Sequence, residues 1–396
     1  MGGLVGYGGD PAVVASRAEI DRVAGQLGVV SSELLGRILH VLPNPIQRVQ
    51  VDIALPGLEY RIHRTRLALA TVAENYFSAE ARVAHSIESV GHALRDHPWL
   101  LNLIPKPLLE KIQLGGAVAF GAAQFAPGSF ASQSTRFLAS STNLDKKADG
   151  VQRIGLLNDK KVWCTTEVVA VRQPVTSLAN IGSRIDGLSS SKGKILVETY
   201  VSDGGQRTLL VYLPGTQSFS PIAGKNPFDL ATDTALVKDP QNSELLKAVT
   251  ESLSQAGAKG ANVILAGYSL GGVAAAALAT QQGLNVTGVV TIGAPVGQIS
   301  LPANIPVLSI EHGNDPIPAA TGETNPLTKN WATASRNFAL PIGTPAIEAH
   351  ELAHYRETLG LVDDSNMAGV SRVRELILSQ LDGSKLVKAE VVAFSR

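Results

Sequence analysis

The chain has 396 residues, of which 44% are hydrophobic, so it is long enough to bury a large core and to form more than one domain. Its 34 basic side chains balance its 34 acidic ones, and this neutral balance gives no indication of nucleic acid as a partner. The single cysteine, Cys164, excludes an intramolecular disulfide framework and favours a reducing compartment.

Residues 1–105 are predicted to form a helical hairpin domain. Apolar or small side chains recur at steps of three and four along residues 10–42 and again along residues 58–94, which is typical of two amphipathic helices. Pro43 and Pro45 separate the two segments. Such a hairpin has to bury its apolar seam, so we expect it to pack on the rest of the chain or to pair with another helical protein.

Three polar residues of this region, His85, His92 and Asp96, share one face of the second predicted helix. A metal site there is conceivable, but a solvated helix face is the commoner explanation, and we predict no metal. The N-terminus lacks a basic segment followed by an apolar one, so no ordinary signal peptide is expected. The apolar run 114–126 is too short to cross a bilayer as a helix, so we expect a soluble protein without a transmembrane segment.

Residues 106–190 are predicted to be a connecting region with a helix and a strand, the strand at "KKVWCTTEVVAV" (160–171). Over residues 191–396, short β-branched runs alternate with helical patterns, which is typical of a parallel sheet covered on both faces. The predicted strands cover 195–201, 208–215, 262–269, 286–294 and 307–313, and the predicted helices lie at about 243–256, 270–282, 347–361 and 369–382. We expect the long connections 216–245 and 316–346 to form the rim or lid of a pocket.

The most informative stretch is "NVILAGYSLGGVAAAALAT" (262–280). Gly267 to Gly271 fit G-x-S-x-G between an apolar strand and an alanine-rich helix, which predicts a nucleophile elbow with Ser269 at its tip. The residues two before and two after the serine must be small, because strand and helix pass close to them, and here both are glycine. The N–H groups that open the following helix favour a developing oxyanion.

A nucleophilic serine needs a general base, and the base needs a carboxylate that orients it. Beyond residue 97, the histidines that could act as the base are His312, His350 and His354. In "VLSIEHGNDPIP" (307–318), Asp315 follows a predicted strand, where sheet enzymes collect catalytic groups. An aspartate before proline is also typical of a plain turn. Glu311, which we expect to lie within the strand, is the reserve acid.

The stretch "LLVYLPGTQSF" (209–219) supplies the remaining part of the predicted site. The backbone N–H of Thr216 or Gln217, together with that of Leu270, would make an oxyanion hole with two donors. A Pro-Gly pair is equally compatible with a turn that merely ends a strand.

Four segments of the chain carry a family resemblance: "VYLPGTQ" (211–217), "AGYSLGG" (266–272), "HGNDPIP" (312–318) and "HELAHYRETLGLVD" (350–363). Over about residues 175–365 the chain resembles the serine α/β-hydrolase superfamily of lipases and esterases. It is most similar to actinobacterial α/β-hydrolases whose N-terminal region resembles the WXG100 helical hairpins. The Trp-x-Gly turn of those hairpins is absent here, so the likeness of the N-terminal region covers helical character only.

The resemblance implies an α/β-hydrolase-type fold, with a mostly parallel sheet covered by helices and preceded by the N-terminal helical hairpin. The catalytic domain is then 191–396. In that group the catalytic histidine precedes a tyrosine by five positions, which implies His350 before Tyr355 and leaves His354 as the reserve base. The implied triad is Ser269, Asp315 and His350, acting on a small-molecule or lipid ester without a cofactor.

Two other functions remain open. "HELAH" (350–354) has the H-E-x-x-H spelling of zinc peptidases. Glu375 stands at a possible distance for a third ligand, but its segment resembles an exposed helix face, and no H-x-x-G-x-x-H spacing follows. A catalytically inert hydrolase scaffold that acts as a binding protein is the third possibility. We expect a cytoplasmic protein, with type VII-like export as the alternative, since "YFSAE" (76–80) matches a Y-x-x-x-[DE] pattern of exported proteins in the group that the chain resembles.

Overall fold

The computed structural model of the chain describes residues 4–8, 160–190, 192–219, 223–238, 243–321, 323–341 and 344–396. All of these belong to one of the two structural units into which the chain divides. The predicted helical hairpin lies outside the described residues, and so do the candidate metal ligands His85, His92 and Asp96, the apolar run 114–126 and the possible export segment 76–80.

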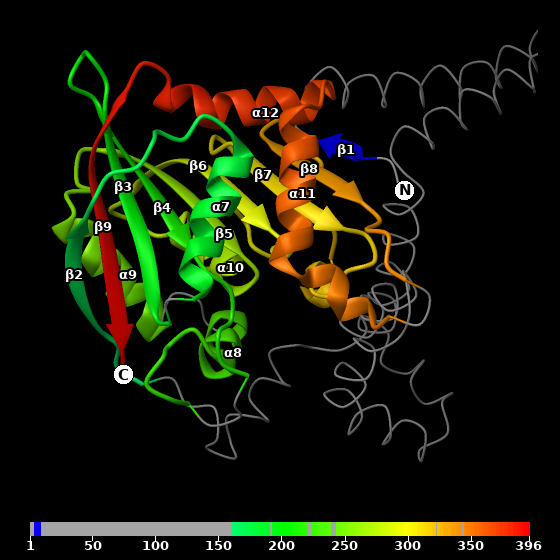
Figure 1. Cartoon of the computed structure of the whole chain (residues 1–396), viewed down its shortest axis with the longest axis horizontal. Helices are drawn as coiled ribbons and strands as arrows, with labels where there is room; N and C mark the ends of the chain where they lie inside the picture. Colours follow the sequence, from blue (N-terminus) through cyan, green and yellow to red (C-terminus); the bar gives the residue numbers. More distant parts are fainter. Residues whose placement is uncertain are drawn as a thin grey trace, which may run out of the picture. The chain divides into compact units, whose positions relative to one another are not determined.

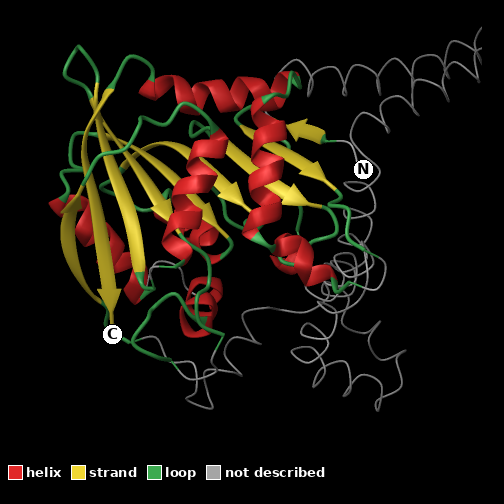
Figure 2. Cartoon of the chain, viewed as in Figure 1, coloured by secondary structure: helices red, strands yellow, loops and turns green. Residues whose placement is uncertain are grey.

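A nine-stranded sheet organises the described residues (Figures 1 and 2). Its strands are β1 (Val5–Gly8), β2 (Trp163–Val169), β3 (Lys194–Val201), β4 (Arg207–Leu213), β5 (Asn262–Tyr268), β6 (Asn285–Ile292), β7 (Val307–His312), β8 (Trp331–Arg336) and β9 (Lys385–Ser395). They are arranged in the order β1-β8-β7-β6-β5-β4-β3-β9-β2. β4 to β8 are built from short buried runs, which is what a strand covered on both faces requires.

The expected fold class, an α/β-hydrolase-type mostly parallel sheet, is wrong. Neighbouring strands from β4 to β8 run parallel, but β3, β9 and β2 on one side and β1 on the other side join antiparallel, so four of the eight pairings are of each kind. β3 and β4 form a hairpin through a tight turn at 202–206, and a hairpin can only join antiparallel strands. The sheet is therefore mixed.

Helices cover both faces of this sheet. α7 (Leu178–Ser189), α11 (Leu352–Asp363) and α12 (Ala368–Leu378) pack on one face, and α8 (Leu230–Lys238), α9 (Glu244–Gln255) and α10 (Leu270–Leu278) pack on the other (Figure 1). Three short 3₁₀ helices complete the described elements: η3 (Pro318–Thr321), η4 (Ala346–His350) and η5 (Ser379–Leu381). No helix of the described ranges is both long and apolar enough to cross a bilayer.

α11 is tied to its neighbours at its C-terminal end. Both carboxylate oxygens of Asp363 accept N–H groups from the first turn of α7, at 2.9 Å from Leu178 and 2.9 Å from Ala179. Arg374 of α12 donates to the carbonyl oxygens of Val362 and Asp363. These bonds satisfy helix-end groups that would otherwise lack partners, and they fix the helix that follows η4.

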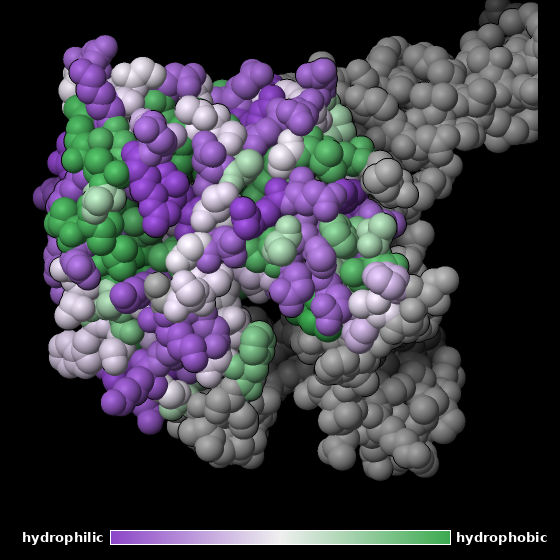
Figure 3. Space-filling model, in the orientation of Figure 1, coloured by the Kyte–Doolittle hydropathy of each residue, from purple (hydrophilic) through white to green (hydrophobic). Residues whose placement is uncertain are grey.

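The edge of the sheet at β2 and β9 exposes large apolar side chains. Trp163 is 62% exposed, Val168 64% and Val387 54%. Figure 3 shows apolar surface gathered over this side of the sheet. These strands lie several positions from β5 and β7 in the strand order, so the apolar edge is separate from the site described below.

Candidate active site

Ser269 lies at a strained backbone turn between β5 and α10. It is the one non-glycine residue with a positive φ among the described residues, at φ 54° and ψ −121°. Such a conformation costs free energy, and it persists only where the surroundings enforce it. Here the Ser269 N–H donates to the Ile292 carbonyl at 2.8 Å, which ties the turn to the end of β6. The turn has the geometry of the nucleophile elbow that the sequence predicts.

The flanking glycines make this turn possible. A Cβ atom at Gly267 would lie 2.0 Å from the carbonyl oxygen of Gly271, and a Cβ atom at Gly271 would lie 2.2 Å from the carbonyl oxygen of Leu213. Both obstacles are backbone atoms, which cannot rotate away as a side chain can. Glycine is therefore required at both positions, for the reason argued from the sequence.

Ser269, His350 and Asp315 form a continuous hydrogen-bonded chain. The Ser269 Oγ lies 2.9 Å from His350 Nε2, and His350 Nδ1 lies 2.6 Å from Asp315 Oδ2. An ionised Asp315 has no proton to give, so His350 Nδ1–H donates to it and Nε2 is left to accept from the serine hydroxyl. The side chain of Asp315 is fully buried, while that of His350 is 14% exposed. The carboxylate is therefore shielded from water and the imidazole remains accessible.

Tyr355 binds Asp315. Its hydroxyl donates to Asp315 Oδ2 at 2.7 Å and accepts the backbone N–H of His312 at 3.0 Å. Burial raises the pKa of Tyr355 well above its ordinary value, and the neighbouring Asp315 acts in the same direction, so the phenol keeps its proton. Asp315 Oδ1 in turn accepts the Ile317 N–H at 2.9 Å. Each oxygen of the carboxylate thus receives a donor besides the imidazole's bond to Oδ2.

Tyr268 is a functional candidate that the sequence did not indicate. It occupies the variable position before the serine in G-x-S-x-G, where the pattern places no constraint. In the structure its hydroxyl donates to the carbonyl oxygen of His350. Its ring also stacks on the imidazole, with centroids 5.1 Å apart and planes at 26°. The residue before Ser269 therefore contacts His350.

Of the two predicted oxyanion donors in the loop after β4, the structure favours Thr216. The Gln217 N–H already donates to the Phe228 carbonyl at 2.8 Å, so Gln217 is a poor choice for this role. The Gln217 side chain is also engaged, accepting from the Gly193 N–H at 2.7 Å. Within the described ranges, the N–H groups of Thr216 and Leu270 donate to no protein acceptor. For Leu270 this is expected in the first turn of a helix.

Asp233 of α8 lies beside this loop and was also missed. Its two carboxylate oxygens are 3.1 and 3.2 Å from the Thr216 hydroxyl. Burial raises the pKa of Asp233 to about 7; the Thr216 hydrogen bond and His350 oppose the rise, and the nearby Asp229 adds to it. The position of Asp233 gave no signal in the sequence, because it lies in a connection for which no helix was predicted.

The remaining sequence candidates lie elsewhere. His354, the reserve base, stacks on Phe338 with centroids 4.0 Å apart, and no described hydrogen bond joins it to Ser269 or Asp315. Glu311, the reserve acid, lies within β7 and accepts from Asn325 at 2.6 Å. Neither takes part in the hydrogen-bonded chain.

The zinc-peptidase spelling does not form one helical turn. His350 ends η4, Glu351 has a non-helical ψ of 130°, and α11 begins only at Leu352. A zinc site of this type needs both imidazoles on one helix face. Among the described residues no group of three or more His, Cys, Asp or Glu side chains is arranged to hold a metal ion.

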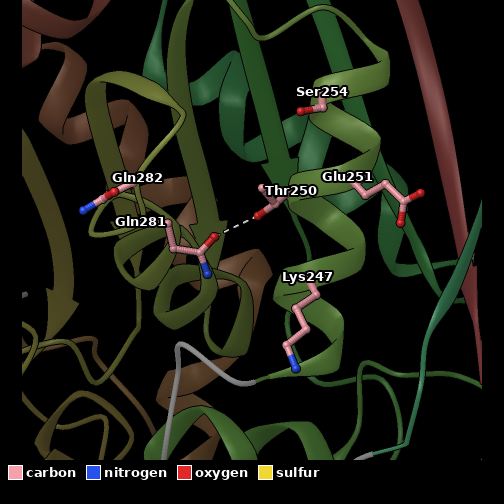
Figure 4. Close-up of a pocket in the computed structure, with 6 residues that line it drawn as sticks. All are labelled: Lys247, Thr250, Glu251, Ser254, Gln281 and Gln282. Atoms are coloured by element: carbon pink, nitrogen blue, oxygen red, sulfur yellow. Dashed lines mark hydrogen bonds between the residues drawn. The ribbon is translucent and has the colours of Figure 1, made fainter.

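Two surface depressions lie away from this chain of residues. One, of about 480 Å³, is lined by α9 and by residues after α10, where Thr250 donates to Gln281 at 2.8 Å (Figure 4). Gln281 and Gln282 of this depression follow the C-terminal end of α10, whereas Ser269 precedes its N-terminal end. The nine residues of α10 span about 14 Å along the helix axis. The other, of about 380 Å³, is lined by residues 297–307 and by residues around Trp331. Neither includes Ser269, His350 or Asp315, so neither is assigned to the site.

Comparison with known proteins assigns no family: no family model, no curated protein and no solved structure matches the chain.

Proposed function

We propose that the chain is a serine hydrolase that cleaves carboxylic esters, related to lipases and esterases. The observation that carries the proposal is the chain of hydrogen bonds from Ser269 through His350 to Asp315, with the serine held at a strained turn. A serine, an imidazole and a buried carboxylate in this order are recognised by geometry and roles, whatever the fold around them. The proposal of an ester as substrate rests on the resemblance of the four sequence segments quoted above to lipases and esterases.

The mechanism is a two-step acyl transfer. Ser269 Oγ attacks the ester carbonyl while His350 Nε2 takes the hydroxyl proton, and Asp315 holds the imidazole in the required tautomer and stabilises the imidazolium. The backbone N–H groups of Leu270 and Thr216 would receive the negative charge that develops on the carbonyl oxygen. His350 then returns the proton to the leaving alcohol, and water releases the acid by the same steps.

Replacing Ser269 by alanine tests the proposal directly. Ser269→Ala should lower the hydrolysis of a short p-nitrophenyl ester on the order of 10⁴-fold or more, because it removes the hydroxyl that is proposed to form the acyl-enzyme. A fluorophosphonate should label the wild-type protein at Ser269 and leave the variant unlabelled.

The matched control is Ser254→Ala, which removes an exposed hydroxyl from α9 at the distant depression. It should keep both activity and labelling. Folded wild-type protein that hydrolyses no ester and takes up no fluorophosphonate would contradict the proposal and favour the inert binding scaffold.

We further propose a small-molecule or lipid ester as the substrate and the cytoplasm as the location. The single cysteine supports a reducing compartment. Export by a type VII-like route is the alternative, and recovery of the protein from the culture filtrate of intact cells would favour it. A panel of esters with graded acyl length would define the substrate.

A further inference from the structure

A second histidine, His312, lies next to the proposed triad without belonging to it. It ends β7, it is 1% exposed, and both of its ring nitrogens have hydrogen-bond partners. Its ring stacks on that of Tyr355, with centroids 3.9 Å apart and planes at 7°. The proposed acyl transfer uses none of these contacts.

The hydrogen bonds define which nitrogen of His312 carries the proton. Nδ1 lies 2.7 Å from the Ala349 carbonyl oxygen, which can only accept, so Nδ1–H is the donor. Burial lowers the pKa of His312 to about 4; the Ala349 bond and Asp315 oppose this shift, while Arg336 and His354 add to it. The ring is therefore neutral at pH 7 and has one N–H.

Nε2 of His312 is consequently an acceptor. The Thr358 hydroxyl lies 2.6 Å from it and supplies the proton, while the Thr358 oxygen accepts from Arg336 Nε at 2.9 Å. A chain of donors thus runs from Arg336 through Thr358 and His312 to the Ala349 carbonyl. The two end links have one direction, because a guanidinium only donates and a carbonyl only accepts. The Thr358 hydroxyl also lies 3.1 Å from the His354 carbonyl oxygen, but the neutral ring leaves Nε2 as an acceptor, and at 2.6 Å it is the nearer partner for the single hydroxyl proton.

This chain ends one residue before the general base. Ala349 and His350 are the last two residues of η4, and their carbonyl oxygens are held by different strand ends: Ala349 by His312 of β7 and His350 by Tyr268 of β5. β5 also leads directly to Ser269, and the loop after β7 contains Asp315. The strands that deliver the nucleophile and the acid therefore also fix the backbone of the base.

We propose that His312 is a positioning residue for His350: as a neutral donor it holds the Ala349 carbonyl, and so it sets the distance from His350 Nε2 to Ser269 Oγ. The proposal rests on the serine hydrolase function proposed above. Misplacement of a catalytic group by about 1 Å can cost on the order of 100-fold in rate, so a single backbone anchor beside the base is enough to matter.

Two conservative variants separate this role from simple packing. In His312→Asn the side-chain amide nitrogen can take the place of Nδ1, so the donor to Ala349 is kept and the contact with Thr358 is lost. In His312→Gln the amide reaches the position of Nε2, so the contact with Thr358 is kept and the donor to Ala349 is lost. Each variant loses one of two buried hydrogen bonds, so their stabilities should be similar.

The expected result is a difference between the two variants in turnover. His312→Gln should lower kcat for a short ester roughly 10- to 100-fold with KM within about twofold, while His312→Asn should stay within about threefold of wild type. Equal kcat in the two variants, after correction for the folded fraction, would overturn the proposal. If neither variant folds, Tyr268→Phe, which removes only the bond to the His350 carbonyl, should lower kcat with unchanged KM; unchanged kcat there would overturn the backbone-anchor argument.

Nitrogen-15 NMR of the histidine rings keeps this test separate from the hydrolase proposal, because it needs no turnover. At pH 7, His312 should give the Nδ1–H tautomer, and the ring signals of His350 should move in His312→Gln and stay in place in His312→Asn. His350 signals that are identical in all three proteins would refute the positioning role, whether or not any ester is cleaved. Absence of ester cleavage and labelling, with the expected NMR pattern, would refute the hydrolase function alone.

Discussion

The carboxyl group of Asp233 offers a quantitative test of the environment around the loop that follows β4. It accepts the Thr216 hydroxyl, and burial raises its pKa to about 7. In Asp233→Asn the side chain keeps an oxygen that can accept from Thr216, but it cannot ionise. The substitution therefore isolates the cost of holding a charged carboxylate in this place.

The sign and size of the change in stability with pH follow from the pKa of Asp233 in the unfolded chain and in the folded protein. In an unfolded chain an aspartate has a pKa of about 3.9. Between about pH 4 and pH 7 the folded protein retains a proton that the unfolded chain releases, so the free energy of unfolding of wild type falls as the pH rises. From pH 5 to pH 7 this amounts to at most about 2.7 kcal/mol, at 1.36 kcal/mol per unit. Since Asp233 is only partly buried, we expect about 1–2 kcal/mol.

Urea denaturation of wild type and Asp233→Asn at pH 5 and pH 8 measures the effect. Tryptophan fluorescence, to which Trp331 buried in β8 contributes, follows the unfolding of the sheet. From pH 5 to pH 8, the free energy of unfolding of the variant should rise by about 1–2 kcal/mol relative to that of wild type. The matched control is Asp186→Asn, because Asp186 is exposed and pairs with Arg356 on the surface, where such pairs contribute little.

The prediction is refuted if the free energy of unfolding of the variant, relative to that of wild type, is the same at pH 5 and pH 8. It is also refuted if this relative free energy is lower at pH 8 than at pH 5. Either outcome would mean that Asp233 is already ionised at no cost in the folded protein.

Two further substitutions test the support of the site. Tyr355→Phe removes a donor to Asp315 and leaves the buried His312 N–H without its acceptor, so the free energy of unfolding in urea should fall by about 2–4 kcal/mol; a loss under about 0.5 kcal/mol would contradict the hydrogen-bond assignment. Gly267→Ala places a Cβ atom 2.0 Å from a backbone oxygen and should abolish fluorophosphonate labelling of Ser269. Its control, Gly360→Ala within α11, meets no atom within 4 Å and should stabilise the fold by roughly 0.5–1 kcal/mol; normal labelling of Gly267→Ala would refute the argument from close backbone approach.

The sequence predicted the parallel centre of the sheet because its strands are short, continuous apolar runs, which are typical of strands that are buried on both faces. β5 and α10 were expected within a few residues of their observed bounds, and α9 matches a clear amphipathic period. β8, in contrast, reads "WATASR" and is buried throughout without a single Val or Ile. Its residues resembled a loop, so the segment 316–346 was expected to be a rim or lid.

The antiparallel part of the sheet could not be inferred from local patterns. β9 follows the last helix and alternates buried with partly exposed residues, and its pairing with β3 and β2 joins segments far apart in the sequence. A strand's period shows that it is half-buried and does not identify its neighbours. Taking the parallel pattern as the rule for the whole domain led to the wrong fold class.

For the site, the sequence supplied the residue types that chemistry requires and missed the residues that hold them. Ser269, Asp315 and His350 were selected by motif and order. Tyr268 and Asp233 were missed, because a tyrosine or an aspartate that orients a neighbour has no characteristic spacing. Their contacts depend on which strand ends and helices meet, and this is decided by tertiary packing.

The backbone corner at Glu351 has a consequence for how such chains are sorted. The motif H-E-x-x-H can bind a metal only where all five residues belong to one helix. Here the backbone leaves the helical conformation directly after His350. The two imidazoles therefore belong to different neighbourhoods, one facing an alcohol and the other facing a phenyl ring. A catalogue built on regular expressions would group this chain with peptidases on the basis of residues that do not act together.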